Sequence, residues 1–458
     1  MGASEIAKLE EEIARLRGLI KSKDSKLNSD FVQKAPPADV EKERQLLEAL
    51  QEQHQSAMEA LRQLLLQPPI GMTQVHFLEW RSPRRGTDNP HDMTNDVWKW
   101  LIKTQLPDDY MHTRLTAYQA NDAFNGPSSY GGEPGWCFAR YGQSETTLPD
   151  GRIVYISGEH EDYYDPDFYI YNDVVIVDPS GGVQIFGYPT EVFPPTDFHS
   201  TTLVDTDIIL IGNLGYSGER HYGQTQVLRL EIDTWRISPI ETFGDLPGWI
   251  HNHKAELSPD GNEIRIIGGK VDRGTKTSFI ENIDEWSLDL QTWHWKRLTR
   301  HQWARFSLRR KDEKRNHLSE MQSLLLWKQL AERDKQYEKT YKESEAELKK
   351  KLGRGGLLSG FFKSTLPDLQ LLKTLYAPDV ATEIITKNVL DDEDEEYNVY
   401  RVRVGDVIVR YIESSYDIQI TVEGELSPDI VEQLRDDVMQ KFAALEGVPI
   451  VCQTIQSE

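Results

Sequence analysis

Residues 26–50, KLNSDFVQKAPPADVEKERQLLEAL, join two amphipathic segments through a corner that contains Pro36 and Pro37. Proline cannot continue a helix but is well tolerated in a first turn, so one helix is expected to end here and another to begin. Apolar or seam positions recur at spacings of three and four on both sides of the corner. They are Ile6, Leu9, Ile13, Leu16, Ile20, Leu47, Leu50, His54, Ala57, Leu61 and Leu64. The pattern predicts an antiparallel helical hairpin over residues 1–67.

The corner and its flanking helices closely resemble the C-terminal coiled-coil arm of valyl-tRNA synthetases, and related arms occur in some ABC-F ATPases. The resemblance covers about residues 4–66. The matching residues are Asn28, Phe31, Val32, Lys34, Ala35, Pro36, Val40, Glu41, Lys42 and Arg44. It implies contact with tRNA, for which we single out Arg15, Arg17, Phe31 and Lys34. The catalytic signatures of those synthetases, of HIGH and KMSKS type, are absent from the chain.

The charge of residues 1–67 leaves two interpretations of this hairpin open. Ten Lys or Arg residues face twelve Asp or Glu residues, a net of −2. Contact with RNA requires a basic stripe, because phosphates reward Lys and Arg. Such a stripe could form toward the corner from Arg15, Arg17, Lys21, Lys23, Lys26 and Lys34. The alternative is an oligomerisation or docking element without RNA.

The totals of the chain favour a multidomain protein. Its 458 residues suggest several units, and its net charge of −23 opposes non-specific binding of nucleic acid by the chain as a whole. Two distant cysteines, Cys137 and Cys452, suit a reducing compartment. The N-terminus lacks an apolar signal segment and no apolar run approaches membrane-spanning length. We therefore expect a cytoplasmic protein with no membrane contact.

Residues 135–300 contain a repeat of turn, strand and glycine. The three copies are LPDGRIVYISGEH, LVDTDIILIGNLG and LSPDGNEIRIIGGK. Their strand-ending glycines, Gly158, Gly212 and Gly268, are 54 and 56 residues apart, and each copy continues with a second strand pair. Four short strands that recur at about 50 residues are typical of β-propeller blades.

This region closely resembles the kelch-repeat family, which implies a propeller segment. The resembling features are the Gly268–Gly269 pair, the turn at 289–292 and Trp295. A histidine position before the first strand is filled by His199 and His253, and we align Ser144 with it in the first copy. Three blades do not close a ring. Residues 68–134 are therefore expected to be a linker or a degenerate blade, unless another chain closes the sheet array. The positions to which the resemblance gives a structural role are Gly158, Gly212, Gly268, Gly269 and Trp295.

Propeller loops offer candidate contacts for a protein partner. Tyrosines anchor many interfaces, and the loops after the first two glycine strands carry Tyr163, Tyr164, Tyr216 and His221. His251 and His253 are predicted to share a strand face, but no third metal ligand accompanies them. We find no catalytic motif and no cofactor pattern. The leading interpretation is a non-catalytic interaction or scaffold protein, with a homo-oligomer as an option; the alternatives are an RNA-associated factor and an enzyme that uses the loop face.

The remaining segments complete the expected architecture. VHFLEW at 75–80 is predicted to be a strand and residues 95–106 a short helix. Residues 301–364 are expected to hold one long charged helix and a glycine-rich linker. Residues 365–458 are predicted to be a small α+β domain with a hairpin turn at Gly405–Asp406.

Overall fold

The computed structural model describes the chain except residues 1, 29–30, 66, 106–123, 125–134, 161–167, 275–278, 353–365, 386–397 and 457–458. It divides into two compact units. The first comprises residues 1–271 and 285–298, and the second comprises residues 272–284 and 299–458. Each is described by itself.

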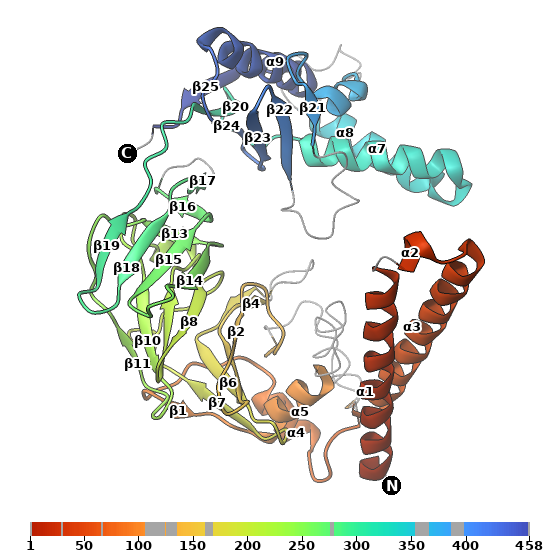
Figure 1. Ribbon diagram of the computed structural model, residues 1–458, viewed down its shortest axis with the longest axis vertical. Helices are drawn as coiled ribbons and strands as arrows, with labels where there is room; N and C mark the ends of the chain where they lie inside the picture. Colours follow the sequence, from red (N-terminus) through yellow and green to blue (C-terminus); the bar gives the residue numbers. More distant parts are fainter. Residues whose placement is uncertain are drawn as a thin grey trace. The chain divides into compact units, whose positions relative to one another are not determined.

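The first unit begins with the helical arm, which we define as residues 2–65. Helix α1 (Gly2–Leu27) and helix α3 (Pro37–Leu65) run antiparallel, with the short α2 (Phe31–Lys34) between them (Figure 1). The predicted hairpin is confirmed, and Pro37 stands at the first position of α3. The residues that are fully buried along the arm are Ile13, Leu16, Val40, Leu50, Met58 and Leu61. The sequence pattern missed Met58, which packs with Ile13 and Leu61.

Three sheets follow, and each has a core of four antiparallel strands in chain order (Figure 1). The first contains β2 (Ser144–Thr147), β3 (Ile153–Ile156), β6 (Asp173–Val177) and β7 (Val183–Gly187). The second contains β8 (Ser200–Val204), β9 (Asp207–Ile211), β10 (Val227–Glu231) and β11 (Ile237–Pro239). The third contains β14 (Lys254–Leu257), β15 (Glu263–Ile267), β18 (Trp286–Asp289) and β19 (His294–Arg297). The repeat read from the sequence therefore corresponds to three sheets.

Short elements supplement these sheets. β1 (His91–Asp92) adds to β7, and β12 (Phe243–Gly244) pairs with β19 in parallel. The other short elements of this region are β4 (Glu159–His160), β5 (Tyr169–Ile170), η2 (Ser217–Glu219), β13 (Trp249–His251) and β16 (Lys270–Asp272). The short strand β17 (Ile280–Glu281) belongs to the second unit.

Helices cover the outer face of the first sheet. Helix α4 (Gln74–Trp80) and helix α5 (Asp96–Gln105) share an apolar core with this sheet, in which Trp98 stacks on Trp136 at 4.8 Å between ring centres. The expected strand at 75–80 is therefore wrong. Thr73 caps a helix by accepting a hydrogen bond from the backbone N–H of His76, and Phe77 points into the core. In the described part of 68–134 the chain forms two helices and one two-residue strand, not a fourth blade.

The third sheet presents a charged outer face. Glu256, Arg265, Ser287 and Lys296 are cross-strand neighbours in register on β14, β15, β18 and β19, and the three charged residues are exposed. Its other face packs Ile264, Ile266 and Leu288 toward the second sheet. A blade inside a closed ring is apolar on both faces, so a polar face marks an end of the stack. The described sheets accordingly form a stack with two different ends, and no closed ring.

Glycine ends the second strand of each sheet in a conformation that side chains resist. Gly212 has a φ of 80°, and a Cβ added there would lie 2.4 Å from the carbonyl oxygen of Ile250. We expect Gly212→Ala to lower the free energy of unfolding by about 3 kcal/mol, measured by urea denaturation. Gly261→Ala is the control, because Gly261 has a φ of 73° but nothing within 4 Å; a loss of about 1 kcal/mol is expected. Equal losses would show that the close approach is unimportant.

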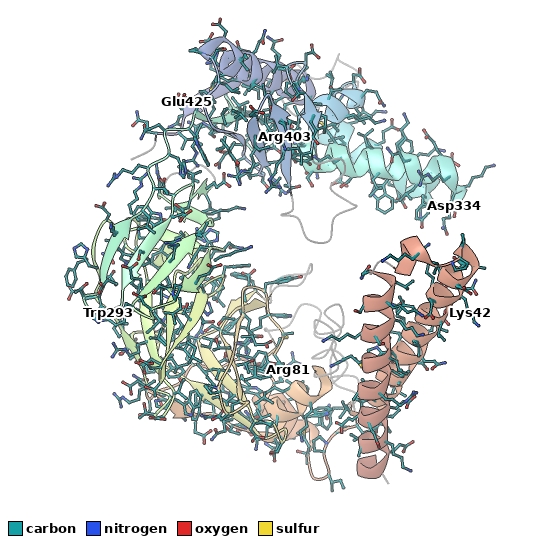
Figure 2. All side chains as sticks on the ribbon, in the orientation of Figure 1. Lys42, Arg81, Trp293, Asp334, Arg403 and Glu425 are labelled. Carbon is teal, nitrogen blue, oxygen red and sulfur yellow. The ribbon has the colours of Figure 1, made fainter. Side chains whose placement is uncertain are left out.

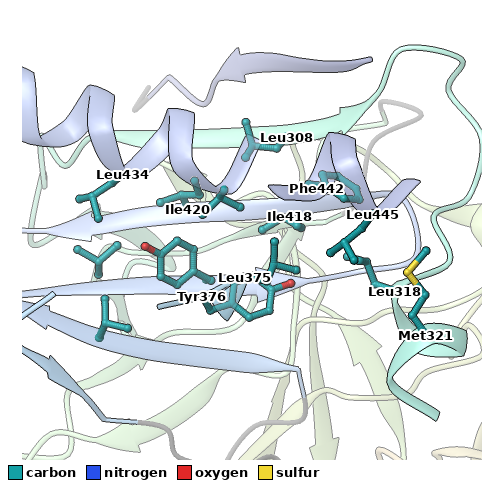
Figure 3. Close-up of a cluster of buried hydrophobic side chains, with 14 of the residues drawn as sticks. Leu308, Leu318, Met321, Leu375, Tyr376, Ile418, Ile420, Leu434, Phe442 and Leu445 are labelled. Atoms are coloured by element: carbon teal, nitrogen blue, oxygen red, sulfur yellow. The ribbon is translucent and has the colours of Figure 1, made fainter. Parts of the chain in front are cut away.

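The second unit is built on a six-stranded antiparallel sheet, in the order β21, β22, β23, β24, β20, β25. Its strands are β20 (Arg305–Arg310), β21 (Glu383–Ile384), β22 (Val399–Val404), β23 (Val407–Glu413), β24 (Asp417–Glu423) and β25 (Ile450–Thr454). The helices are α7 (Leu318–Arg333), η3 (Lys335–Tyr337), α8 (Glu338–Leu352), η4 (Leu369–Thr374) and α9 (Pro428–Glu446). Figure 3 shows the buried side chains, including Leu308, Ile420 and Phe442, that join the sheet to its helices.

Two expectations for residues 301–364 differ from the structure. Strand β20 lies inside the C-terminal sheet between β24 and β25, so this unit begins well before residue 365. The single long helix is two, α7 and α8, because Asp334 leaves the helical conformation and its side chain accepts a hydrogen bond from the N–H of Gln336 (Figure 2). Leu318, Met321, Leu324 and Leu348 are buried, so the pair packs on the sheet.

Glu413 is a buried acid at the end of β23. Its carboxylate accepts hydrogen bonds from Tyr376 Oη at 2.6 Å and from Gln322 Nε2 at 3.0 Å. Burial outweighs these bonds and raises the pKa of Glu413 to about 7. The folded protein therefore holds the proton of Glu413 more tightly than the unfolded chain, whose carboxyl pKa is about 4.5. This contribution to the free energy of unfolding is complete below pH 4.5 and is lost as the pH rises through 7.

We expect Glu413→Gln to reduce the pH dependence of stability. Between pH 5 and pH 8 the wild-type free energy of unfolding should fall by about 2 kcal/mol more than that of the variant. Urea denaturation at both pH values measures the difference. Glu432→Gln changes an exposed acid in the same unit and should behave as wild type. Parallel pH profiles of wild type and Glu413→Gln would refute the assignment.

Candidate nucleic-acid interface on the helical arm

The tip of the arm, which we define as residues 15–44, is closed by backbone hydrogen bonds. The N–H of Asn28 donates to the carbonyl of Asp24 at 2.9 Å, which ends α1. The carbonyl of Pro36 accepts from the N–H groups of Asp39 and Val40, which starts α3. Val40 is the buried residue of α3 nearest to this turn. The proline pair therefore fixes the point at which the chain reverses.

An ion-pair clamp joins the two long helices near the tip. Glu43 on α3 accepts hydrogen bonds from Lys23 Nζ at 2.7 Å and from Lys26 Nζ at 2.6 Å on α1. These bonds, that of Lys23 before that of Lys26, lower the pKa of Glu43 to about 2. Two members of the predicted basic stripe thus hold the helices together. Arg15 is likewise paired, with Glu12 one turn away at 2.6 Å.

Exposed cations gather on the tip. Those that the structure shows as exposed on residues 15–44 are Arg15, Arg17, Lys21, Lys34, Lys42 and Arg44. Figure 2 shows Lys42 on the outer side of α3. Residues 15–44 carry eight basic and five acidic side chains, a net of +3, whereas the rest of 1–67 carries two basic and seven acidic, a net of −5. The arm therefore has a positive tip and a negative base, a difference that its total charge of −2 does not show.

The predicted contact residues do not form one patch. Arg15 and Arg17 lie two positions apart on α1, and 100° per residue places them on different sides of the helix, whereas Arg17 and Lys21 share a side. Lys34 ends α2 and is exposed. Phe31 begins α2, but its side chain lies outside the described part of the structure. Lys42 and Arg44, which belong to the residues that carry the resemblance, are also exposed on α3.

The structure describes two of the four loop residues that were predicted to contact a protein partner. Tyr163 and Tyr164 lie outside the described residues. The hydroxyl of Tyr216 accepts a hydrogen bond from the N–H of Ile170 at 2.9 Å, so it ties two parts of the first unit together. His221 is exposed, with its ring edge-on to Trp249.

Buried histidines link successive sheets. His199 Nε2 lies 2.9 Å from Ser144 Oγ, and His253 Nε2 lies 2.8 Å from Ser200 Oγ. Ser144 and Ser200 both begin the first strand of a sheet, so Ser144 corresponds to Ser200 and the alignment of Ser144 with the histidine position is wrong. Burial lowers the pKa of both histidines to about 3, which keeps them neutral.

The expected shared face of His251 and His253 is interrupted. His251 ends β13, His253 precedes β14, and Asn252 between them has a φ of 56°. Among the described residues no group of three or more His, Cys, Asp or Glu side chains could hold a metal ion.

One family model matches the chain, and its match lies on the arm. Residues 3–65 match the family model of the valyl tRNA synthetase tRNA binding arm. This match confirms the resemblance read from the corner sequence. No curated protein matches the chain.

Several solved structures are similar to part of the chain. Among them is a fungal alcohol oxidase of the AA5 family in complex with copper, with 12% sequence identity and a TM-score of 0.24. The similarity covers 36% of this chain and spans 44% of that one. No described helix is long and apolar enough to cross a membrane.

Proposed function

We propose that this chain is an RNA-associated factor whose helical arm contacts tRNA through the tip. The observation that carries the proposal is the family match over residues 3–65, which spans both long helices and the turn between them. The family is named for binding tRNA, and the matched residues include the corner with its proline pair. The enzyme signatures do not accompany it.

The charge distribution supports a contact made by the tip. Phosphates attract Lys and Arg and release counterions when bound, so a tip of net +3 favours the RNA backbone. The rest of the arm carries −5, and the chain beyond residue 67 carries −21. These acidic parts repel RNA, so the arm is expected to meet it with the tip first.

The clamp at Glu43 supports a rigid presentation. Lys23 and Lys26 hold α1 against α3 close to the turn, where the apolar seam is thin. A rigid tip loses less conformational entropy on binding than a frayed one. Arg17, Lys21 and Lys34 then offer exposed charge next to a fixed scaffold.

The second candidate is a protein-interaction role for the sheet region, in which kelch-like sheets present loops to a partner. Its support is the loop between β9 and β10, where Tyr222 is 48% exposed beside His221. The two roles are compatible in one cytoplasmic factor that tethers a protein to RNA.

Affinity capture from native lysate tests the proposal. We define the tip variant as Arg17→Glu, Lys21→Glu and Lys34→Glu. The distal variant reverses three exposed lysines outside the arm and has the same net charge: Lys254→Glu, Lys296→Glu and Lys339→Glu. The wild type and the distal variant should recover tRNA, and the tip variant should not. Equal recovery of RNA by all three chains, or recovery of protein without RNA by the wild type, would contradict it.

A further inference from the structure

The C-terminal sheet ends in a strand with one open edge. Strand β25 has five residues, Ile450 to Thr454, and pairs along its whole length with β20. It stands last in the strand order, and no described strand pairs with its other side.

Hydrogen bonds beside the strand show which backbone groups face the open edge. The N–H of Ile455 donates to the carbonyl of Arg305, and the N–H of Lys311 donates to the carbonyl of Pro449, both at 2.9 Å. Residues bonded to a neighbour alternate along an antiparallel strand. The positions bonded to β20 are therefore the odd-numbered ones, and the N–H and C=O groups of Ile450, Cys452 and Thr454 point outward.

The composition of β25 leaves this edge unprotected. Proteins usually blunt an edge with charge, proline or short length. Among the described sheet edges, β2 carries Glu145, β14 carries Lys254 and Glu256, and β11 ends in Pro239. The other edge strands are short, with two or three residues each: β1, β4, β5, β12, β13, β17 and β21. Strand β25, IVCQT, has no charge and no proline. Strand β8 is similarly neutral, but its hydroxyls bond to neighbouring sheets.

We propose that β25 pairs antiparallel with β25 of a second copy of this chain, across a two-fold axis at Cys452. Cys452 then lies opposite Cys452 of the second copy, and Ile450 lies opposite its Thr454. Each such pair exchanges two backbone hydrogen bonds, about six in total. Two six-stranded sheets become one continuous sheet.

The charges beside the axis suit a second copy. Arg435 and Asp436 on α9 both lie close enough to act electrostatically on the Cys452 thiol, and their side chains are 27% and 46% exposed. Arg435 and Asp436 pair with each other at 2.8 Å, so this charged group is neutral as a pair and does not repel its symmetry-related copy. A strand pair alone buries less than a standard interface, and the two α9 helices on the same face enlarge it.

Measurement of mass by light scattering tests this association on the full chain. The wild type should approach twice 52.8 kDa as its concentration rises to about 100 µM, a range in which weak interfaces associate. Cys452→Ser should behave as wild type. Cys452→Lys places like charges opposite each other and should weaken dimerisation at least about 10-fold. Its fold should persist, because Cys452 is exposed and its neighbours make the bonds to β20.

A crosslink distinguishes this interface from any other. A short bismaleimide should join two wild-type chains through Cys452, since Cys137 is buried, and should not join the Cys452→Ser chains. A single-chain mass over the whole concentration range would overturn the proposal. So would a dimer that resists Cys452→Lys, or one that is lost on removal of residues 1–66 but not on Cys452→Lys.

Discussion

The tip variant should bind tRNA about 100-fold more weakly than the wild type in equilibrium titrations near 100 mM salt. The reason is that Arg17, Lys21 and Lys34 are exposed cations on the positive end of the arm. Each reversal removes an attraction to a phosphate and adds a repulsion. The slope of log affinity against log salt should become shallower by about three.

Two controls make this result specific. The distal variant has the same total charge, so a long-range effect of charge would weaken it equally, and we expect less than a few-fold change. Circular dichroism should show that the tip variant keeps its helices, since the seam residues are untouched. An unchanged affinity of the tip variant would place any tRNA contact elsewhere.

Removal of the carboxylate of Asp173 should cause the largest loss of stability. Asp173 and Arg140 form a two-pronged ion pair, with Arg140 Nη2 and Asp173 Oδ2 2.9 Å apart, and their side chains are 5% and 0% exposed. The indole N–H of Trp136 also donates to Asp173 at 3.0 Å, and the guanidinium lies over the Tyr171 ring. Asp173→Leu leaves this buried cation unpaired. The free energy of unfolding should fall by about 3–5 kcal/mol.

A double variant separates the ion pair from the packing. Arg140→Met with Asp173→Leu removes both charges, and it should recover most of the loss, because an apolar pair can replace a buried ion pair. Asp150→Asn breaks the exposed pair with Arg152 and should leave the free energy of unfolding close to that of the wild type. Urea denaturation of the wild type, Asp173→Leu, the double variant and Asp150→Asn measures these free energies of unfolding. A double variant as unstable as Asp173→Leu would refute the explanation.

The sequence predicted the arm because its information is local. The three-four spacing and the proline pair determine both helices and their reversal. It did not predict the clamp, because Lys23 and Glu43 are 20 positions apart and meet only after the chain folds back. The total charge of the arm also hid the positive tip, since acidic residues near its base offset the basic ones.

The sheet region was predictable in its repeat but not at its ends. A period near 55 residues predicted the three sheets. The helices that cover the first sheet depend on contacts of Trp98 and Phe77 with residues far away in the sequence, which the local pattern does not show. The burial of both ends of β20 could not be predicted for a similar reason. Arg305 and Arg310 look solvated in sequence but are 3% and 6% exposed, because Arg305 donates to a carbonyl and Arg310 pairs with Glu446.

Crosslinking of the full chain to tRNA with ultraviolet light, followed by mass spectrometry of the peptides, tests the central claim most directly. We expect crosslinked nucleotides on peptides from residues 15–44, and their loss in the tip variant but not in the distal variant. Crosslinks confined to residues 68–458, or none under conditions in which tRNA binds, would contradict a tRNA contact made by the tip of the arm.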